Sequence, residues 1–157
     1  MKIRHPLFVG LVAAFAVSLA SVAVSAAAAG TPFKGTVNAV ETSQVVSPTA
    51  SVTRNGGGTA THLGKYTEHI TLQINLPTRH AIGAATFTAA NGDTLTATLD
   101  GQATPTASPG VLSIVEVYTI TGGTGRFAGA TGTFTLKSVV NQATGVSSGT
   151  FSGTIDH

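Results

Sequence analysis

Polar and apolar residues alternate with a period of two along much of the chain after residue 30. This period is typical of β-strands that bury one face, and the same region has no helical period. The alternation predicts strands, or pieces of strands, at residues 33–39, 45–53, 59–76, 81–90, 94–100, 111–121, 133–140 and 147–155. We therefore expect an all-β domain of seven or eight strands.

The connections between these segments are short and rich in turn-forming residues. The Asn-Gly-Asp sequence at 91–93 predicts a hairpin, because Asn and Gly tolerate a positive φ. We expect a bulge at Gly64 within the long 59–76 segment, and the Gly-rich stretch 55–58 before it is expected to be flexible. A predicted loop covers 101–110. No helix is available to connect parallel strands, so an antiparallel up-and-down barrel or sandwich is expected.

The first thirty residues follow a different pattern. Lys2 and Arg4 make a short positive segment, and residues 7–20 are almost wholly apolar. Small residues then follow at 21–30. This order is the layout of a secretory signal peptide.

The uncharged segment 6–29 also allows a second interpretation, a retained membrane anchor, because it is long enough to span a bilayer. The small residues at its end favour removal by signal peptidase, with cleavage near 27–30. We therefore expect a signal peptide at 1–29 and a single β-barrel domain at 30–157. The mature protein is expected to be secreted and not to associate with a membrane.

Removal of the signal peptide changes the charge of the protein. The chain has eight Lys and Arg residues against six Asp and Glu residues. Lys2 and Arg4 leave with the signal, so six basic residues remain and the mature net charge is about zero. No basic patch for nucleic acid is expected.

The residue types also limit the chemistry. The chain has no cysteine, which excludes disulfides, thiolate metal ligands and a cysteine nucleophile. His62 and His69 have opposite parity on one predicted strand, and no histidine spacing indicates a metal site. No Gly-x-Ser-x-Gly elbow is present to hold a nucleophilic serine. The sequence implies neither a cofactor nor a metal.

The most distinctive segment is 121–132, with the sequence TGGTGRFAGATG. Gly123, Gly125 and Ala128 fit the dinucleotide fingerprint G-x-G-x-x-A, but that interpretation requires a helix directly afterwards. Residues 131–135 alternate as a strand instead, and no Gly-Lys-Ser/Thr sequence indicates a P-loop. Nucleotide binding is therefore not expected.

This segment resembles the strand-connecting GGTGRF-x-G-A-x-G turn of the allene oxide cyclase-like and dirigent-like barrels. The sequence TATHLGKY at 59–66 is similar to a stretch that recurs in small secreted bacterial members of that group. The resemblance implies an eight-stranded antiparallel barrel with a central cavity, and often association through the outer faces into a homo-oligomer. Phe127 is expected to lie under the barrel end and Arg126 to cap exposed carbonyls. The motif transfers a fold and not an activity.

Two predicted strands each place a carboxylate and a phenol on an apolar stripe. Glu116 and Tyr118 share a face with Leu112, Ile114 and Ile120, and Tyr66 and Glu68 share one with Ile70, Leu72 and Ile74. If both stripes face a barrel interior, burial raises the pKa of the carboxyls and suits them to general acid or base catalysis. Glu116, Tyr118, Glu68 and Tyr66 are therefore the candidate catalytic residues.

Two alternatives give these glutamates no catalytic role. A bulge would shift the register and move every later side chain to the other face. Otherwise, the glutamates lie near strand ends and pair with Lys65, Lys137 or Arg126.

Three functions fit a barrel of this kind. The first is binding of a small apolar molecule without transforming it, which needs only a cavity with an apolar lining. The second is a cyclase- or dirigent-like role that steers ring closure or coupling of a small substrate. The third is a non-catalytic interaction module at the cell surface, whose barrel is filled by its own side chains.

Overall fold

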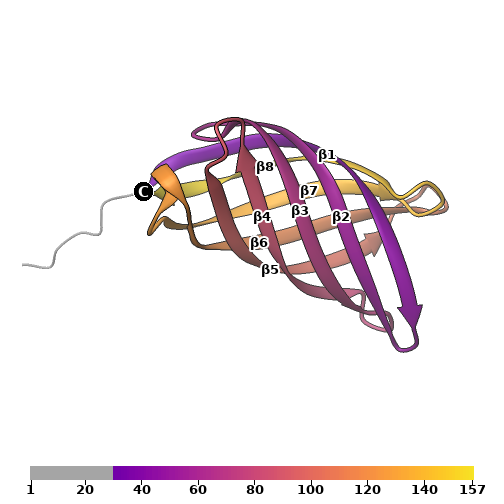
Figure 1. The fold of residues 1–157 in the computed structure, drawn as a ribbon. Coiled ribbons are helices and arrows are strands. Elements are labelled where there is room, and N and C mark those ends of the chain that lie inside the picture. The colour runs from indigo at the N-terminus through magenta and orange to yellow at the C-terminus, as the bar shows by residue number, and fades with distance from the viewer. Residues whose placement is uncertain (1–29) are drawn as a thin grey trace, which may run out of the picture.

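The computed structural model describes residues 30–157, in which eight antiparallel strands close into a barrel. Each strand pairs with its neighbours in the sequence, and the last strand returns to pair with the first (Figure 1). The elements are β1 (Thr31–Val46), β2 (Thr49–Ala60), β3 (Gly64–Asn75), β4 (His80–Ala89), β5 (Thr94–Pro105), β6 (Val111–Gly123), the short 3-10 helix η1 (Gly125–Phe127), β7 (Thr131–Asn141) and β8 (Val146–Asp156). The predicted eight-stranded barrel is confirmed, and the expected signal peptide at 1–29 lies outside the described residues.

Alternation along each strand separates the barrel interior from its outer surface. On β3, Tyr66, Glu68, Ile70 and Leu72 are buried, and the residues between them are exposed. The buried apolar residues form one cluster that is drawn from all eight strands and from η1. The period of two in the sequence thus corresponds directly to the inside and the outside of the barrel.

Two segments are divided differently from the prediction. The expected long strand at 59–76 is two strands, because a turn at 61–63 separates β2 from β3 and Gly64 begins β3. The stretch 55–58, expected to be flexible, belongs to β2 and pairs with β1. A side chain at Gly58 would collide with the carbonyl of Thr36, so glycine allows the two strands to approach closely.

The strand β5 is also longer than expected. Residues 101–105 were predicted as part of a loop, but β5 continues through them and pairs with the start of β6. The loop prediction was wrong there because Gly and Pro are turn formers only by local propensity, and pairing across the barrel overrides that propensity.

One end of the barrel is sealed by apolar side chains. Phe127 from η1 is fully buried, as are Leu63, Leu95 and Ile155. Arg126 lies over the Phe127 ring at 5.0 Å, and its Nη2 donates to the carbonyl of Leu63 at 3.5 Å. The segment 121–132 therefore closes the barrel end in the way its sequence predicted.

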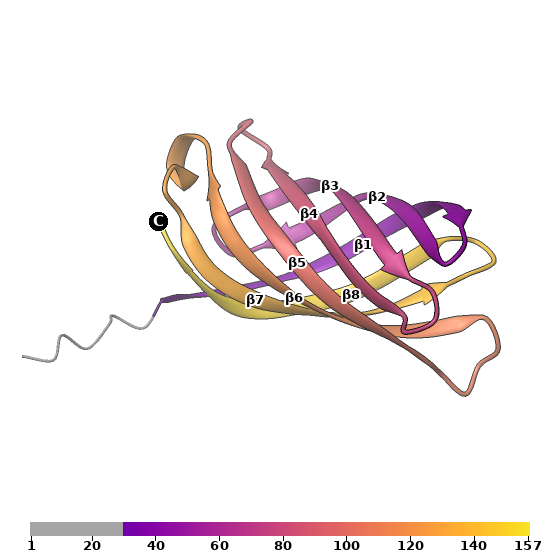
Figure 2. The same ribbon diagram turned by 90° about the horizontal axis from the view of Figure 1, so that it is seen from below.

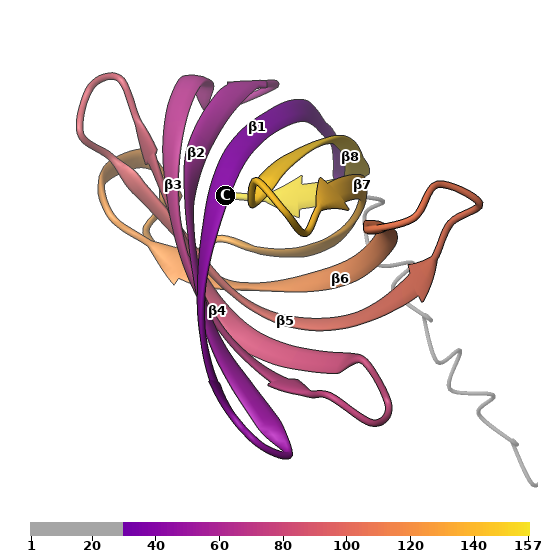
Figure 3. The same ribbon diagram turned by 90° about the vertical axis from the view of Figure 1, so that its right-hand side faces the viewer.

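The opposite end has no such seal. It carries the turns that connect β1 to β2, β3 to β4, β5 to β6 and β7 to β8, and Figure 3 looks toward it. The turn between β5 and β6 projects beyond its neighbours (Figure 2). The barrel is therefore shaped like a cup, with a closed base and an open mouth.

Candidate binding cavity and buried ion cluster

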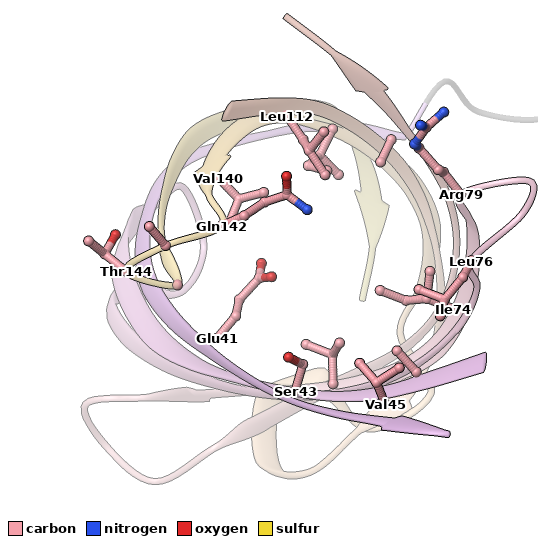
Figure 4. A pocket seen from close by; sticks show the side chains of 16 residues that line it. Glu41, Ser43, Val45, Ile74, Leu76, Arg79, Leu112, Val140, Gln142 and Thr144 are labelled. Atoms are coloured by element: carbon pink, nitrogen blue, oxygen red, sulfur yellow. The ribbon is translucent and has the colours of Figure 1, made fainter. Parts of the chain in front are cut away.

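A cavity of about 470 Å³ occupies the open end of the barrel (Figure 4). Its wall is largely apolar and consists of Val45, Ala50, Val52, Ile74, Leu76, Ala103, Leu112, Ile114 and Val140. The polar residues on it are fewer, with Glu41 and Ser43 from β1, and Gln142 and Thr144 from the turn between β7 and β8. Both the volume and the lining are typical of a site for a small molecule.

A cluster of charged side chains lies between this cavity and the aromatic core. The inward-facing residues of β6 show where this cluster lies. Ile114 belongs to the cavity wall, Glu116 is the next inward residue, and Tyr118 after it packs against the aromatic ring of Phe134. Arg54, on β2, reaches Glu116 across the barrel interior. The charged cluster thus separates the cavity from the sealed half of the barrel.

Arg54 and Glu116 form a bidentate ion pair. The Nη1 of Arg54 donates to Oε1 of Glu116 at 3.1 Å, and Nη2 donates to Oε2 at 2.8 Å. Nη2 also donates to the phenol oxygen of Tyr118, and the Tyr118 hydroxyl donates to Oε2 of Glu116 at 2.7 Å. Both charged side chains are almost fully buried, and removing them from water costs free energy. The two parallel hydrogen bonds of the pair compensate for much of this cost.

Glu68 has a poorer partner in the same cluster. Its Oε1 lies 3.4 Å from the Nε of Arg54, and neither atom makes a hydrogen bond within the described residues. Burial raises the pKa of Glu68 to about 7, and the charges of Glu116 and Glu41 act in the same direction. Arg54 offsets only part of this rise. Glu68 is therefore expected to change between its protonated and ionised forms near neutral pH.

Glu41 is the member of the cluster that reaches the cavity. It pairs with Arg54 in the register of β1 and β2, but its Oε1 lies 3.7 Å from Nη1, beyond a hydrogen bond. Its side chain is 19% exposed, and its carboxylate points into the middle of the cavity (Figure 4). Burial raises its pKa, and Arg54 opposes that shift.

The structure brings together three of the four residues that the sequence predicted. Glu116, Tyr118 and Glu68 surround Arg54, whereas Tyr66 is buried nearby and donates its hydroxyl to the carbonyl of Thr36 at 2.9 Å. Burial raises the pKa of both tyrosines, so both remain protonated donors. None of the four belongs to the cavity wall, and their catalytic role stays a prediction.

The expected alternative partners of the glutamates are not the ones observed. Lys65 and Lys137 lie on the outer face of the barrel, and Arg126 lies at the sealed end, 3.8 Å from Asp93. The buried glutamates are instead held by Arg54. Pairing with these three basic residues was therefore wrong.

Sequence reasoning missed Arg54 and Glu41. The predicted strand at 45–53 stopped one residue short of Arg54, although Arg54 continues the inward alternation of Ala50 and Val52. Glu41 similarly continues the inward positions of Val37 and Ala39. Extending the alternation on each strand to the next inward residue would have found both.

A glycine provides the space for the ion pair. Gly101 on β5 faces Glu116 in the register of β5 and β6. A Cβ at Gly101 would lie 2.8 Å from the Cγ of Glu116, closer than such atoms pack. A larger residue at this position would therefore require the Glu116 side chain to shift.

The charged interior predicts a dependence of stability on pH. Burial holds the pKa of Glu68 at about 7 in the fold, against a reference value of 4.5. The contribution of Glu68 to the free energy of unfolding is therefore full below pH 4.5 and is lost as the pH rises through 7. Between about pH 5 and about pH 8 we expect Glu68→Gln to remove about 2 kcal/mol of this loss. Urea unfolding of the wild type and the variant at about pH 5 and about pH 8 measures the effect.

The exposed Asp156 provides the control for this experiment, since Asp156→Asn removes a carboxylate outside the barrel. This control is expected to lose as much stability between about pH 5 and about pH 8 as the wild type does. Glu68→Gln is expected to lose less, and the loss that remains comes from Glu41, whose pKa is also raised. If Glu68→Gln loses as much stability over this range as the wild type, then Glu68 is already ionised at acidic pH.

The described part of the chain has no arrangement typical of a metal centre. Among residues 30–157, no group of three or more His, Cys, Asp or Glu side chains is placed to hold a metal ion. His80 pairs with Asp100 at 3.1 Å, but both side chains are exposed on the surface. Over the same range, no helix has both the length and the apolar character needed to cross a membrane.

Fold and site together define a closed eight-stranded β-barrel with a cavity at one end and a buried ion cluster beneath it. Comparison of the chain with protein-family models, curated proteins and solved structures gives no match. The resemblance of 121–132 to the allene oxide cyclase-like barrels therefore stays a prediction that rests on the sequence motif.

Proposed function

We propose that this protein is a secreted barrel that binds a small apolar molecule in its open cavity. The observation that carries this proposal is the difference between the two ends of the barrel. One end is filled by Leu63, Leu95 and Phe127, whereas the other keeps a cavity of about 470 Å³ with an apolar wall. An interior that served only to stabilise the fold would gain free energy by filling this space.

The position of the cavity supports the same function. Its wall is formed mainly by strands, which hold their side chains rigidly, and turns surround only its mouth. Arg54, Glu68 and Glu116 lie beneath it as a tightly packed layer. A molecule entering through the mouth would thus meet a preformed wall, which lowers the entropic cost of binding.

Blocking the cavity tests the proposal. We expect Ala103→Trp to weaken binding of the neutral fluorophore prodan by about tenfold or more, because Ala103 lies in the wall and an indole there fills the space. The protein is expressed from the full chain, and binding is measured by the rise in prodan fluorescence. Thermal unfolding of the variant shows that the barrel is intact.

Ala90→Trp is the matched control, since Ala90 is exposed in the turn between β4 and β5 at the sealed end. This variant is expected to bind prodan as the wild type does. Equal binding by both variants, or no binding by the wild type, would contradict a ligand site in the cavity. Native mass spectrometry of the wild type would then identify any molecule that co-purifies.

A cyclase- or dirigent-like activity is the second candidate function. It is favoured by Glu41, a carboxyl with a raised pKa that points into an apolar cavity and is suited to general acid or base catalysis. Glu116 is less suited, because Arg54 holds both of its oxygens. If the protein transforms its ligand, the wild type and Glu41→Gln should co-purify with molecules of different chromatographic retention. The same molecule in both preparations would count against catalysis.

A further inference from the structure

The charges inside the barrel do not balance. Glu41, Glu68 and Glu116 share one buried guanidinium, that of Arg54. Arg54 matches Glu116 with two short hydrogen bonds, and the other two carboxylates lie at 3.4 and 3.7 Å from its nitrogens. The interior therefore has more negative than positive charge when the glutamates are ionised.

Arg54 is not available to an anionic ligand. Its Nη atoms donate to Glu116 and Tyr118, its Nε faces Glu68, and its side chain is only 2% exposed. An incoming carboxylate or phosphate would have to displace Glu116 from a bidentate pair, at a large cost in free energy. The floor of the cavity thus offers no free positive charge.

Glu41 is available from the cavity. The nearest nitrogen of Arg54 is 3.7 Å from its carboxylate, which points toward the centre of the cavity (Figure 4). Ser43, Gln142 and Thr144 are polar residues of the same wall, and all three are neutral. A group that donates hydrogen bonds and carries positive charge could approach Glu41 from the cavity more closely than Arg54 does.

We propose that the cavity selects amphipathic molecules with a cationic head, such as a primary amine, which pairs with Glu41 while the apolar part contacts the wall. This inference rests on the proposed function. Arg79 is the other charged residue that borders the cavity, but it lies in the exposed turn between β3 and β4. Water screens a charge in that position, so Glu41 dominates the selection.

Three ligands with the same ten-carbon chain test the head group. Decylamine, decanol and decanoate are titrated against prodan-loaded protein, and the displacement of prodan gives each affinity. We expect decylamine to bind about tenfold or more tightly than decanol, and decanoate to bind most weakly. In Glu41→Gln, decylamine is expected to bind no better than decanol.

Asp156→Asn is the matched control, because it also replaces a carboxylate by an amide but at an exposed residue outside the cavity wall, and it is expected to preserve the preference for the amine. Because prodan is neutral, its binding tests the cavity alone and not the selection by Glu41. If prodan binds but the three ligands bind equally, or if Glu41→Gln keeps the preference, selection by Glu41 is wrong and the binding cavity stands. If neither prodan nor any ligand binds, both proposals are overturned.

Proton binding provides a further check on the same variants. The ionisable groups that act on Glu41 inside the barrel are Arg54 on β2, Glu68 on β3 and Glu116 on β6, and Arg79 borders the same cavity from the turn between β3 and β4. The preference for decylamine over decanol is expected to decrease as the pH falls through the raised pKa of Glu41. A preference that does not change at acidic pH would contradict pairing with this carboxylate.

Discussion

Replacement of Arg54 by Met is expected to lower the free energy of unfolding by about 3–5 kcal/mol at neutral pH. The reason is that the side chains of Glu68 and Glu116 are almost fully buried and lose the guanidinium that pairs with them. Methionine has nearly the volume of the arginine stem, so the loss reflects charge more than packing. Urea unfolding of protein expressed from the full chain measures the difference.

Two further measurements distinguish this cause from general damage to the barrel. Arg126→Met removes an arginine that is 45% exposed at the sealed end, and it is expected to cost less than about 1 kcal/mol. Acidification should restore part of the stability of Arg54→Met, because the stranded carboxyls can then be protonated. A variant that is as stable as the wild type at neutral pH would show that the glutamates are neutral in the fold.

Replacement of Phe134 by Ala is expected to cost about 3–5 kcal/mol, the range for removing a large aromatic side chain from a core. Phe134 lies at the centre of the aromatic cluster, where it stacks on Tyr118 with 4.5 Å between the ring centres. Its ring also lies within 5.9 Å of the rings of Phe33, Phe87 and Phe151. Thermal and urea unfolding measure the loss.

The variant also affects the ion cluster, because Phe134 supports the Tyr118 ring whose hydroxyl contacts Glu116 and Arg54. Val139→Ala is the control on the same strand, since Val139 is 47% exposed on the outer face. This control is expected to change stability by less than about 0.5 kcal/mol. Equal effects of the two variants would contradict the central position of Phe134.

Most of the fold could be predicted from local patterns. The period of two identified the strands, and the Asn-Gly-Asp sequence at 91–93 marked the turn between β4 and β5. The predicted strand ends failed where glycine or proline lies inside a strand, as at 55–58 and 101–105. Turn propensity is local, whereas these residues are held by pairing with strands that are distant in the sequence.

Less of the candidate site could be predicted. Parity correctly placed Glu68 and Glu116 on the same faces as apolar residues, and both faces are buried in the fold. The sequence did not indicate that one guanidinium links them, since Arg54 lies 62 residues from Glu116. Strand pairing around a closed barrel brings such positions together, and no short motif records it.

The sequence by itself determined the all-β class of the protein and which residues of each predicted strand share a face. Alternation fixes inside and outside locally, because neighbouring side chains on a strand must point in opposite directions. Only the tertiary structure decided which end of the barrel is open and that Glu41 faces the cavity. These features depend on closure and on the register between distant strands, which determine how far each inward residue lies from either end.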